Sequence, residues 1–490
     1  MSAGAPAASA VADRYEMVVG LEVHVQLKTR TKAFCNCSTE FGSAPNVNTC
    51  PVCLALPGAL PVLNAHAVEL ATRTALALCC TVHPTSIFAR KNYFYPDLPK
   101  GYQISQFDRP LATDGSLVIG HREDGSPVRV GITRVHMEED AGKSIHDRFP
   151  RSSAIDLNRS GMPLVEIVSE PDMRSAAEAG AYLRVLKQLL DYAEVSDVSM
   201  EEGSLRVDAN VSARLRGETT LGTKTELKNL NSFSSVERAL ELEYARHCAL
   251  LDRGETVHQQ TMLWDAARGE VRPARSKEGS HDYRYFPEPD LPPLVLTTNW
   301  IEQQRTALPE LPQARQARFA AEYALPAYDV EVLTASRALA DYFEAVARQH
   351  GEPKAAANWV MGELLAALKA SDHSIAEFPV RPTDLAQLLN MVRDGLLSHS
   401  AAKKVFATMP STGQRPEQVA ADAGLLQVGD DAALQAWIDE VLAAHPGEWE
   451  RFRNGEKKLM GVLVGGVMKR SNGSADPSKV NQLLLAMAGG

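Results

Sequence analysis

Residues 16–27 alternate apolar and polar side chains with a period of two. This is the repeat of a β-strand, whose successive side chains point to opposite faces of a sheet. Residues 204–212 and 223–228 alternate in the same way. Strands with one apolar and one charged face are typical of a sheet that packs one face on a core and leaves the other wet. The sequence therefore predicts a largely antiparallel sheet.

The charged positions of these strands carry side chains that are more typical of a catalytic site than of a solvent-exposed sheet face. They are Glu22, His24 and Gln26 in the first strand, Arg206, Asp208 and Asn210 in the second, and Lys224, Glu226 and Lys228 in the third. Carboxylates bind the hard cation Mg²⁺, and basic side chains neutralise phosphate oxygens. A solvated sheet face would explain any one strand, but the strands together favour a Mg²⁺-nucleotide site.

A Gly-Lys-Ser triplet at 142–144 invites comparison with a P-loop. That motif requires glycine at position 137, where this chain has Met137, and the acidic run 138–140 would repel phosphate. We reject the P-loop, and the same carboxylates are better suited to hold Mg²⁺ directly or through water. The sequence contains no G-x-G and no G-x-S-x-G motif, so it predicts neither a dinucleotide site nor hydrolytic machinery of its own.

Four cysteines, Cys35, Cys37, Cys50 and Cys53, form a C-x-C-x12-C-x2-C pattern. Two close pairs separated by a turn-rich segment favour tetrahedral Zn²⁺ over disulfides in a protein of a reducing compartment. The alternative is a set of unrelated thiols. The remaining cysteines lie in helical segments and are predicted to fill the core: Cys79, Cys80 and Cys248.

The chain of 490 residues is too long for a single core, and its composition changes along its length. Residues 1–14 are predicted to form a disordered tail, and residues 15–296 mix strands, turns and a few helices. Two of these helices are expected over 175–193 and 234–252, each opened by a serine cap. Residues 297–410 show a helical pattern, and residues 411–490 form a smaller helical tail domain.

No apolar stretch approaches the ~20 residues of a membrane-spanning helix, and the N-terminus does not resemble a signal peptide, so we expect a cytoplasmic protein without a membrane. The net charge of −10 argues against general nucleic-acid coating. A basic segment at 451–470 is the exception, and it predicts either RNA contact or a solvated helical face. The glycines within it equally suggest close helix packing.

Two further segments, 90–106 and 277–290, mix Arg and Lys with Tyr and Phe. Such mixtures hold phosphates and stack on bases, although structural loops use the same residues. Spacing alone leaves both interpretations open.

Several long motifs follow one another along the chain: GLEVHVQL (20–27), RKNYFYPD (90–97), HMEEDAGK (136–143), LNR with PLVEIVSEP (157–171) and DYRYFPEPD (282–290). In this order they together resemble the GatB family, the B subunits of aspartyl/glutamyl-tRNA(Asn/Gln) amidotransferases. The resemblance implies an α+β fold, with a glutamine-synthetase-like cradle, an all-helical domain and a GatB/YqeY-type tRNA-binding tail. It also implies a heterotrimer in which a glutaminase/amidase subunit hydrolyses glutamine and a small third subunit joins it to this chain.

The activity implied is ATP-dependent conversion of Glu-tRNA(Gln), Asp-tRNA(Asn) or both to the amidated forms. ATP would phosphorylate the side-chain carboxylate, and ammonia from the glutaminase subunit would then attack the acyl phosphate. This is the chemistry of a ligase that forms carbon–nitrogen bonds with glutamine as amido donor. The Cys quartet then becomes a structural zinc site.

Strand geometry and the resemblance together give each candidate residue a role. The leading Mg²⁺ ligands are Glu22, His24 and Glu139. Further ligands or substrate-orienting groups are Glu138, Asp208 and Glu226, and Asp208 alternatively orients ammonia. ATP is expected to contact Lys91, Arg206 and Lys143, and tRNA to contact Lys457, Lys458, Lys469 and Arg470.

Two other classes of function compete with this prediction. A non-catalytic RNA-binding scaffold would use the cysteine loop and the basic tail. Carboxylates that converge on one face argue against it, because they would repel a polyanion. A free-standing amide ligase acting on free glutamate would not need the additional helical domains.

Overall fold

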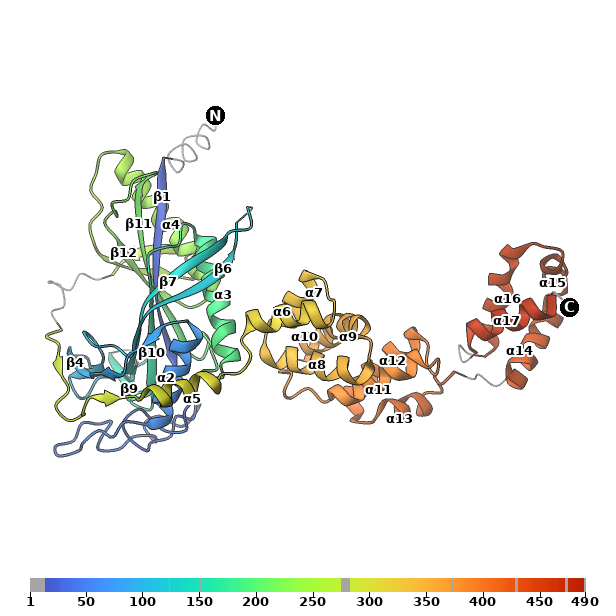
Figure 1. Ribbon diagram of the computed structural model, residues 1–490, viewed down its shortest axis with the longest axis horizontal. Helices are drawn as coiled ribbons and strands as arrows, with labels where there is room; N and C mark the ends of the chain where they lie inside the picture. Colours follow the sequence, from blue (N-terminus) through green and yellow to red (C-terminus); the bar gives the residue numbers. More distant parts are fainter. Residues whose placement is uncertain are drawn as a thin grey trace. The chain divides into compact units, whose positions relative to one another are not determined.

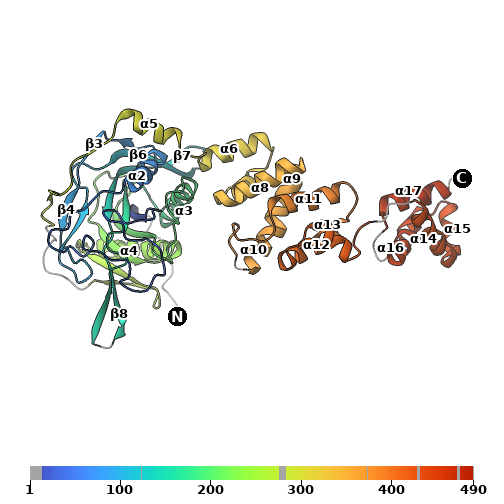
Figure 2. The same ribbon diagram turned by 90° about the horizontal axis from the view of Figure 1, so that it is seen from below.

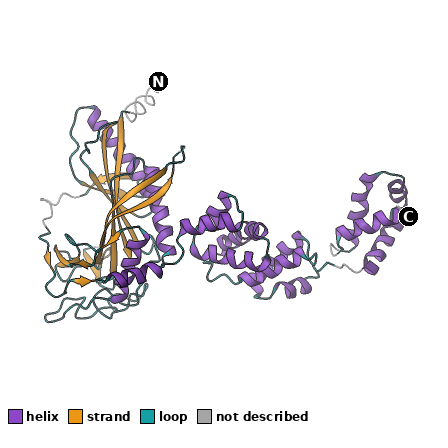
Figure 3. Cartoon of the chain, viewed as in Figure 1, coloured by secondary structure: helices purple, strands orange, loops and turns teal. Residues whose placement is uncertain are grey.

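A nine-stranded sheet organises the first of the two units into which the chain divides, Met1–Pro312 and Gln313–Gly490. The computed structural model describes residues 14–122, 124–149, 151–274, 283–371, 373–427, 431–471 and 475–488. The predicted tail at 1–14 therefore lies, except for residue 14, outside the described residues. All strands belong to the first unit, and helices make up the second (Figure 1, Figure 3).

The large sheet confirms the α+β prediction, because its neighbouring strands are antiparallel except for the parallel pair β12 and β13. In spatial order the strands are β14 (Glu270–Pro273), β13 (Thr261–Asp265), β12 (Thr225–Leu230), β11 (Leu205–Leu215), β1 (Tyr15–Gln26), β10 (Pro163–Ser169), β7 (Pro127–Glu139), β6 (Ala112–His121) and β2 (Thr81–Val82).

Strand β1 lies inside the sheet, between β10 and β11, and its two faces differ as the alternation predicts. Leu21, Val23 and Val25 are buried, while Glu22 and His24 face the opposite side and are half-buried. A strand paired on both edges has no freedom to rotate, so its polar side chains hold fixed positions relative to those of its neighbours.

Three helices cover the apolar face: α2 (Ala65–Ala77), α3 (Ala176–Tyr192) and α4 (Phe233–Asp252). Ser175 caps α3 as predicted, because its side chain accepts a hydrogen bond from the backbone N–H of Glu178. The cap of α4 is Ser232 rather than the predicted Ser234. A run of serines there made the first helical residue ambiguous in the sequence.

The cysteines outside the quartet follow the core prediction only in part. Cys80 and Cys248 are buried, but Cys79 is exposed. Cys79 follows the end of α2 with a φ of 57°, and this left-handed turn points its thiol away from the core.

The first unit also contains smaller elements outside the nine-stranded sheet. A three-stranded sheet joins β4 (Ala89–Asn92), β5 (Tyr102–Ser105) and β15 (Phe286–Pro287), and a short pair joins β3 (Thr85–Ser86) and β16 (Leu294–Val295). A separate ribbon of β8 (Lys143–Phe149) and β9 (Ser152–Asp156) projects from the unit (Figure 2). Helix α5 (Thr298–Thr306) belongs to this unit, because Trp300 and Ile301 pack against its core.

The second unit begins within α6 (Pro312–Glu322). The following helices are α7 (Ala327–Leu333), α8 (Arg337–His350), α9 (Pro353–Trp359), the π-helix η1 (Val360–Leu364), α10 (Leu365–Ser371), α11 (Pro382–Arg393), α12 (His399–Thr412) and α13 (Pro416–Asp422). The last helices share a hydrophobic cluster of their own and are α14 (Asp431–Ala444), α15 (Pro446–Arg453), the 3₁₀ turn η2 (Lys457–Leu459), α16 (Met460–Arg470) and α17 (Pro477–Ala488). None of the described helices has the length and apolar character required to cross a membrane.

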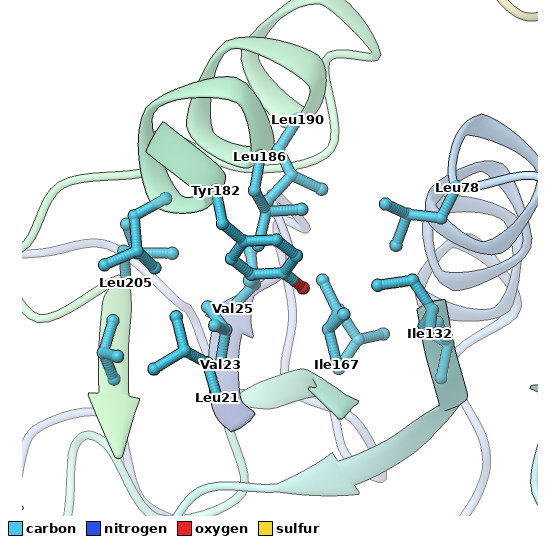
Figure 4. Close-up of a cluster of buried hydrophobic side chains, with 14 of the residues drawn as sticks. Leu21, Val23, Val25, Leu78, Ile132, Ile167, Tyr182, Leu186, Leu190 and Leu205 are labelled. Carbon is cyan, nitrogen blue, oxygen red and sulfur yellow. The ribbon is translucent and has the colours of Figure 1, made fainter. Parts of the chain in front are cut away.

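Tyr182 of α3 lies over the apolar side of the sheet, among Leu21, Val23, Ile132 and Ile167 (Figure 4). Its side chain is fully buried, and its hydroxyl has no hydrogen-bond partner among the described residues. A buried donor without a partner loses its hydration and gains nothing in return, so this position costs stability.

Tyr182→Phe is therefore expected to stabilise the first unit by about 1 kcal/mol, because it removes a polar group that folding leaves unpaired. The matched control is Tyr342→Phe in the second unit, where the hydroxyl donates to the carbonyl of Val380 at 2.9 Å. That change should cost about 1 kcal/mol. Urea unfolding of the full chain, with hydrogen exchange to separate the units, measures both, and a destabilised Tyr182→Phe protein would contradict the assignment.

Candidate functional site

Two carboxylates and an imidazole converge on the charged face of the sheet. The Nε2 atom of His24 lies 3.5 Å from Oε1 of Glu138 and 3.3 Å from Oε2 of Glu166. These ligand atoms lie within 4.8 Å of one another, a grouping that suits a metal ion. Both carboxylates are buried, and His24 remains partly open to solvent.

Strand register brings the cluster together. His24 on β1 pairs with Glu166 on β10, and Glu166 in turn pairs with His136 on β7. Glu138 lies two residues beyond His136 on the same strand and therefore on the same face. The cluster thus joins β7 and β10 to β1, which lies about a hundred residues or more before them in the sequence.

Burial and charge act in opposite directions on these groups. Burial alone would lower the pKa of His24, but its hydrogen bond with Glu166 and the charge of Glu138 raise it above its usual range. Burial likewise opposes ionisation of Glu166, yet the charge and hydrogen bonds of His136 and His24 hold its pKa well below the usual range. Glu166 is therefore an anion at neutral pH, as a cation ligand must be.

Glu166 and His136 were absent from the predicted site. Glu166 is the one charged residue in the apolar strand 163–168, and a lone carboxylate in a buried strand was the available signal. His136 lies just before the acidic run 138–140, and its Nε2 lies 3.4 Å from Oε2 of Glu166.

Two of the predicted metal ligands are bonded elsewhere. Glu22 accepts a hydrogen bond from the side-chain amide of Asn210 at 3.1 Å. On β1 it is the next residue to His24 on the same face of the strand. Glu139 is on the other side of β7 from Glu138, where it binds the ammonium of Lys100 and the backbone N–H of Ile104. The structure thus groups His24 with Glu138 and Glu166 rather than with Glu22 and Glu139.

Asp208 and Glu226 form a second acidic group around Lys228. The Nζ atom of Lys228 lies 2.7 Å from Oδ2 of Asp208 and 3.0 Å from Oε1 of Glu226. Burial opposes the lysine charge, but the two carboxylates raise its pKa above the usual value. Asp208 pairs with Glu22 across β1 and β11, so this group adjoins the metal-type cluster on the same face.

Basic residues border the cluster on its other sides. Arg206 binds Asp140 at 2.8 Å, and its buried Nε has no hydrogen-bond partner among the described residues. Lys91 lies 5.1 Å from the ring centroid of Tyr283. Burial opposes its charge, but Glu138 above all raises the pKa of Lys91, which therefore stays protonated. Lys143 is exposed on the β8–β9 ribbon and lies outside the charged face.

The four quartet cysteines converge, because their Sγ atoms lie within 4.8 Å of one another. The thiol of Cys53 accepts a hydrogen bond from the backbone N–H of Cys50 at 3.0 Å. Hydrogen bonding from Cys35 lowers the pKa of Cys53 to about 4, and the nearby charge of Lys32 favours the thiolate. Four converging sulfur atoms, one of them a thiolate at neutral pH, are a donor set for a soft or borderline metal ion.

The predicted RNA contacts in the tail lie at opposite ends of one helix. Lys457 and Lys458 precede α16, while Lys469 and Arg470 end it, and all four are exposed. Arg470 pairs with Glu440 at 2.8 Å. A Cβ added to Gly466 would meet Val441 of α14 at 2.8 Å, so this glycine serves helix packing, which was the alternative interpretation of the segment.

Comparisons with known proteins match nearly the whole chain. The family model of the GatB/GatE catalytic domain matches residues 17–302, and that of the GatB domain matches residues 341–487. A protein of Syntrophotalea carbinolica, named among the B subunits of aspartyl/glutamyl-tRNA(Asn/Gln) amidotransferases, is 54% identical over 96% of this chain and 98% of its own length. Proteins of the same name from Geotalea uraniireducens and Moorella thermoacetica are 53% and 54% identical over 97% and 96% of the chain, and over 100% and 99% of their own lengths.

The cluster predicts a divalent-cation site that depends on Glu166. Glu166→Gln is expected to weaken Mn²⁺ binding by roughly tenfold or more, because it removes one anionic ligand while keeping the shape of the side chain. Glu170→Gln, an exposed residue just beyond β10, is the matched control and should bind as the parent protein does. Electron paramagnetic resonance of free and bound Mn²⁺ measures both, and equal affinities would remove Glu166 from the site.

Proposed function

The chain belongs to the GatB family, and we propose that its charged sheet face phosphorylates and then amidates the side-chain carboxylate of Glu or Asp esterified to tRNA. The activity of this family is transamidation of a misacylated tRNA, with glutamine as amido donor. The observation that carries the proposed site is the His24–Glu138–Glu166 cluster, bordered by Lys91 and Arg206.

The three clustered side chains fit a Mg²⁺ ion bound to ATP. Two carboxylates provide the oxygen ligands that Mg²⁺ prefers, and the imidazole makes the site compatible with Mn²⁺ as well. A cation bound there supplies neutralisation of phosphate oxygens. We assign Lys91 and the guanidinium of Arg206 to the same phosphates, because each is a cationic side chain beside the cluster.

In the first chemical step, an oxygen of the substrate carboxylate attacks the γ-phosphorus of ATP. The bond between that phosphorus and the β–γ bridging oxygen breaks, and ADP leaves. The side-chain carboxyl carbon now carries a phosphate, which is a good leaving group, whereas the oxide of a free carboxylate is not. Positioning and charge neutralisation account for most of the catalysis, because no enzyme nucleophile is required.

In the second step, ammonia attacks the acyl carbon, the bond to the phosphate oxygen breaks, and inorganic phosphate leaves. The nitrogen loses a proton as the amide forms. We propose that the Asp208–Lys228–Glu226 group orients ammonia and accepts this proton, because it holds two carboxylates beside the cluster. Glu22 adjoins both groups, and Glu139, which is bonded to Lys100, receives no metal in this proposal.

The name of the relatives describes one component of a larger enzyme. We propose that a glutaminase/amidase partner supplies ammonia from glutamine, that a small third chain completes a heterotrimer, and that the complex works in the cytoplasm. The exposed basic residues Lys457, Lys458, Lys469 and Arg470 are the proposed contacts with the tRNA body. The ribbon residue Lys143 is the weakest ATP candidate, because it lies outside the charged face.

A test of this function uses the complex with its partner subunits, charged tRNA, Mg²⁺, ATP and ammonium. Glu138→Gln should reduce amide formation by roughly 100-fold or more, because it removes a cation ligand at the phosphoryl-transfer site. Glutamine hydrolysis by the partner should persist. Glu202→Gln, on an exposed turn, is the control and should retain full activity.

Normal amide formation by Glu138→Gln would place the site elsewhere. Tight tRNA binding by the parent complex without any amide formation would instead support an RNA-binding scaffold. Amide formation on free glutamate would point to a small-molecule ligase.

We also propose that the cysteine quartet holds one structural Zn²⁺. Cys53→Ser is expected to reduce the zinc content of purified protein from about one ion per chain to well below that, because serine removes one thiolate ligand. Mass spectrometry of the metal content makes the measurement. The control is Cys79→Ser, which changes an exposed thiol outside the quartet, and zinc loss in both variants or in neither would count against the site.

A further inference from the structure

Strand β12, which carries two members of the acidic group around Lys228, pairs irregularly with β11. Val207 and Ala209 of β11 are two residues apart, whereas their partners on β12, Leu230 and Leu227, are three apart. Strand β12 therefore holds one extra residue, a β-bulge, and Lys228 lies within it. A bulge interrupts the hydrogen bonds of the ladder and turns side chains out of the regular alternation. The ladder alone therefore leaves the direction of Lys228 weakly fixed.

Thr225 begins β12 and supplies a second attachment for the strand. Its side chain is fully buried and points to the opposite face from that of Glu226. Its hydroxyl donates a hydrogen bond to Oε1 of Glu243 at 2.8 Å and lies 3.0 Å from Nε2 of His247. Both partners belong to α4, which contacts β11 and β12 (Figure 1). One buried side chain thus joins β12 to the helix that packs on it.

The proton positions in this contact follow from the groups that can donate. Burial opposes ionisation of Glu243, but hydrogen bonds with His247, Arg246 and Thr225 lower its pKa to about 2, so its carboxylate accepts only. Thr225 therefore gives its proton to Glu243, and its oxygen accepts from His247. The Nδ1 atom of His247 is buried without a hydrogen-bond partner among the described residues, which places the ring proton on Nε2. The contact is therefore directional.

Arg246 balances the charge of Glu243. Its Nη2 atom lies 2.6 Å from Oε1 of the carboxylate, and its Nε atom lies 3.0 Å from Oε2. A buried carboxylate is costly to separate from its partners, so Glu243 holds a fixed position on α4. The start of β12 is thus tied to a rigid point of the helix.

Glu226 follows Thr225 directly and takes its position from the same strand. Its backbone N–H donates to the carbonyl of Gln260 at 3.0 Å, and its Oε2 accepts from the hydroxyl of Thr261 at 2.9 Å. Its other carboxylate oxygen lies 3.0 Å from Nζ of Lys228. These contacts orient the carboxylate, while Thr225 fixes the strand that carries it.

We propose that Thr225 is a positioning residue for the second chemical step, because it ties β12 to Glu243 and His247 and so holds the acidic group around Lys228 in the geometry that orients ammonia. This inference rests on the proposed function and adds which buried contact sets that geometry. A displacement of about 1 Å caused far from the chemistry can lower a rate by roughly 100-fold, so the loss of one hydrogen bond is sufficient. A purely structural role would instead lower stability without changing the fate of the acyl phosphate.

The test measures ADP and amide together, in the complex with its partner subunits, charged tRNA, Mg²⁺, ATP and saturating ammonium. Thr225→Val removes the hydroxyl and keeps the shape of the side chain. It should release roughly threefold more ADP than amide, whereas the parent should release the two in about equal amounts. Misdirected ammonia leaves the acyl phosphate to water, which attacks the acyl carbon, expels phosphate and restores the carboxylate. The KM for ATP should remain that of the parent.

Thr225→Ser keeps the hydroxyl and should couple ADP to amide as the parent does. The matched control for stability is Thr74→Val on α2, because Thr74 is also buried and donates to the carbonyl of Leu70 at 2.9 Å. It should lose a similar amount of stability in urea unfolding and keep the parent ratio of ADP to amide. Thr225→Ala is a second variant without the hydroxyl and replaces Thr225→Val if that protein does not fold.

The proposal is overturned by a parent ratio in Thr225→Val, by an equal excess of ADP in Thr225→Ser or Thr74→Val, or by a parallel fall in both products. Glu226→Gln separates this result from the proposed function. An excess of ADP in Glu226→Gln but not in Thr225→Val would mean that the acidic group acts without this anchor, and only the positioning role would fail. A parent ratio in Glu226→Gln would instead remove the proposed second step itself.

Discussion

The arrangement of the charged face depends on the pairing register of β1 with its neighbours on both edges. His24 meets Glu166 on one side and Arg206 on the other, and Glu22 meets Asp208, because these Cα positions are partners in the ladder. A slip of one residue would exchange the two faces and place the carboxylates in the core. The fully buried Leu21, Val23 and Val25 prevent that slip, since it would expose them to water. The packing of the apolar face of β1 therefore determines which charged side chains meet on the opposite face.

The charges of this face fall into two kinds. Some are already matched within the chain, such as Lys228 with Asp208 and Glu226, or Lys100 with Glu139. Others leave capacity for a ligand: two buried carboxylates, Glu138 and Glu166, adjoin the partly exposed His24, and the guanidinium of Arg206 is partly exposed beside them. Buried groups of this second kind are costly in the free protein, and a site that binds a cation and a polyphosphate recovers that cost when occupied.

The helical tail shows how one sequence feature can serve two purposes. Gly466 lets α16 approach α14 closely, whereas added Cβ atoms at Gly461 and Gly465 meet nothing. The basic residues around this helix lie at both of its ends, about 17 Å apart by the rise of an α-helix, and so do not form one compact patch. Any polyanion that contacts both ends must extend along the helix, as a nucleic-acid backbone does.

Local pattern in the sequence determined the elements. The alternation of residues 16–27 predicted β1 and its two faces, the spacing of the quartet predicted four converging thiols, and Ser175 predicted the start of α3, because each depends on nearby residues alone. Family motifs identified the activity. Tertiary structure decided the composition of the site, since Glu166 and His136 join His24 only because β1 pairs with β10, more than a hundred residues away, and β10 pairs with β7. It also separated Glu138 from Glu139, which are neighbours in the chain but point to opposite sides of β7, so that one faces the cluster and the other faces Lys100.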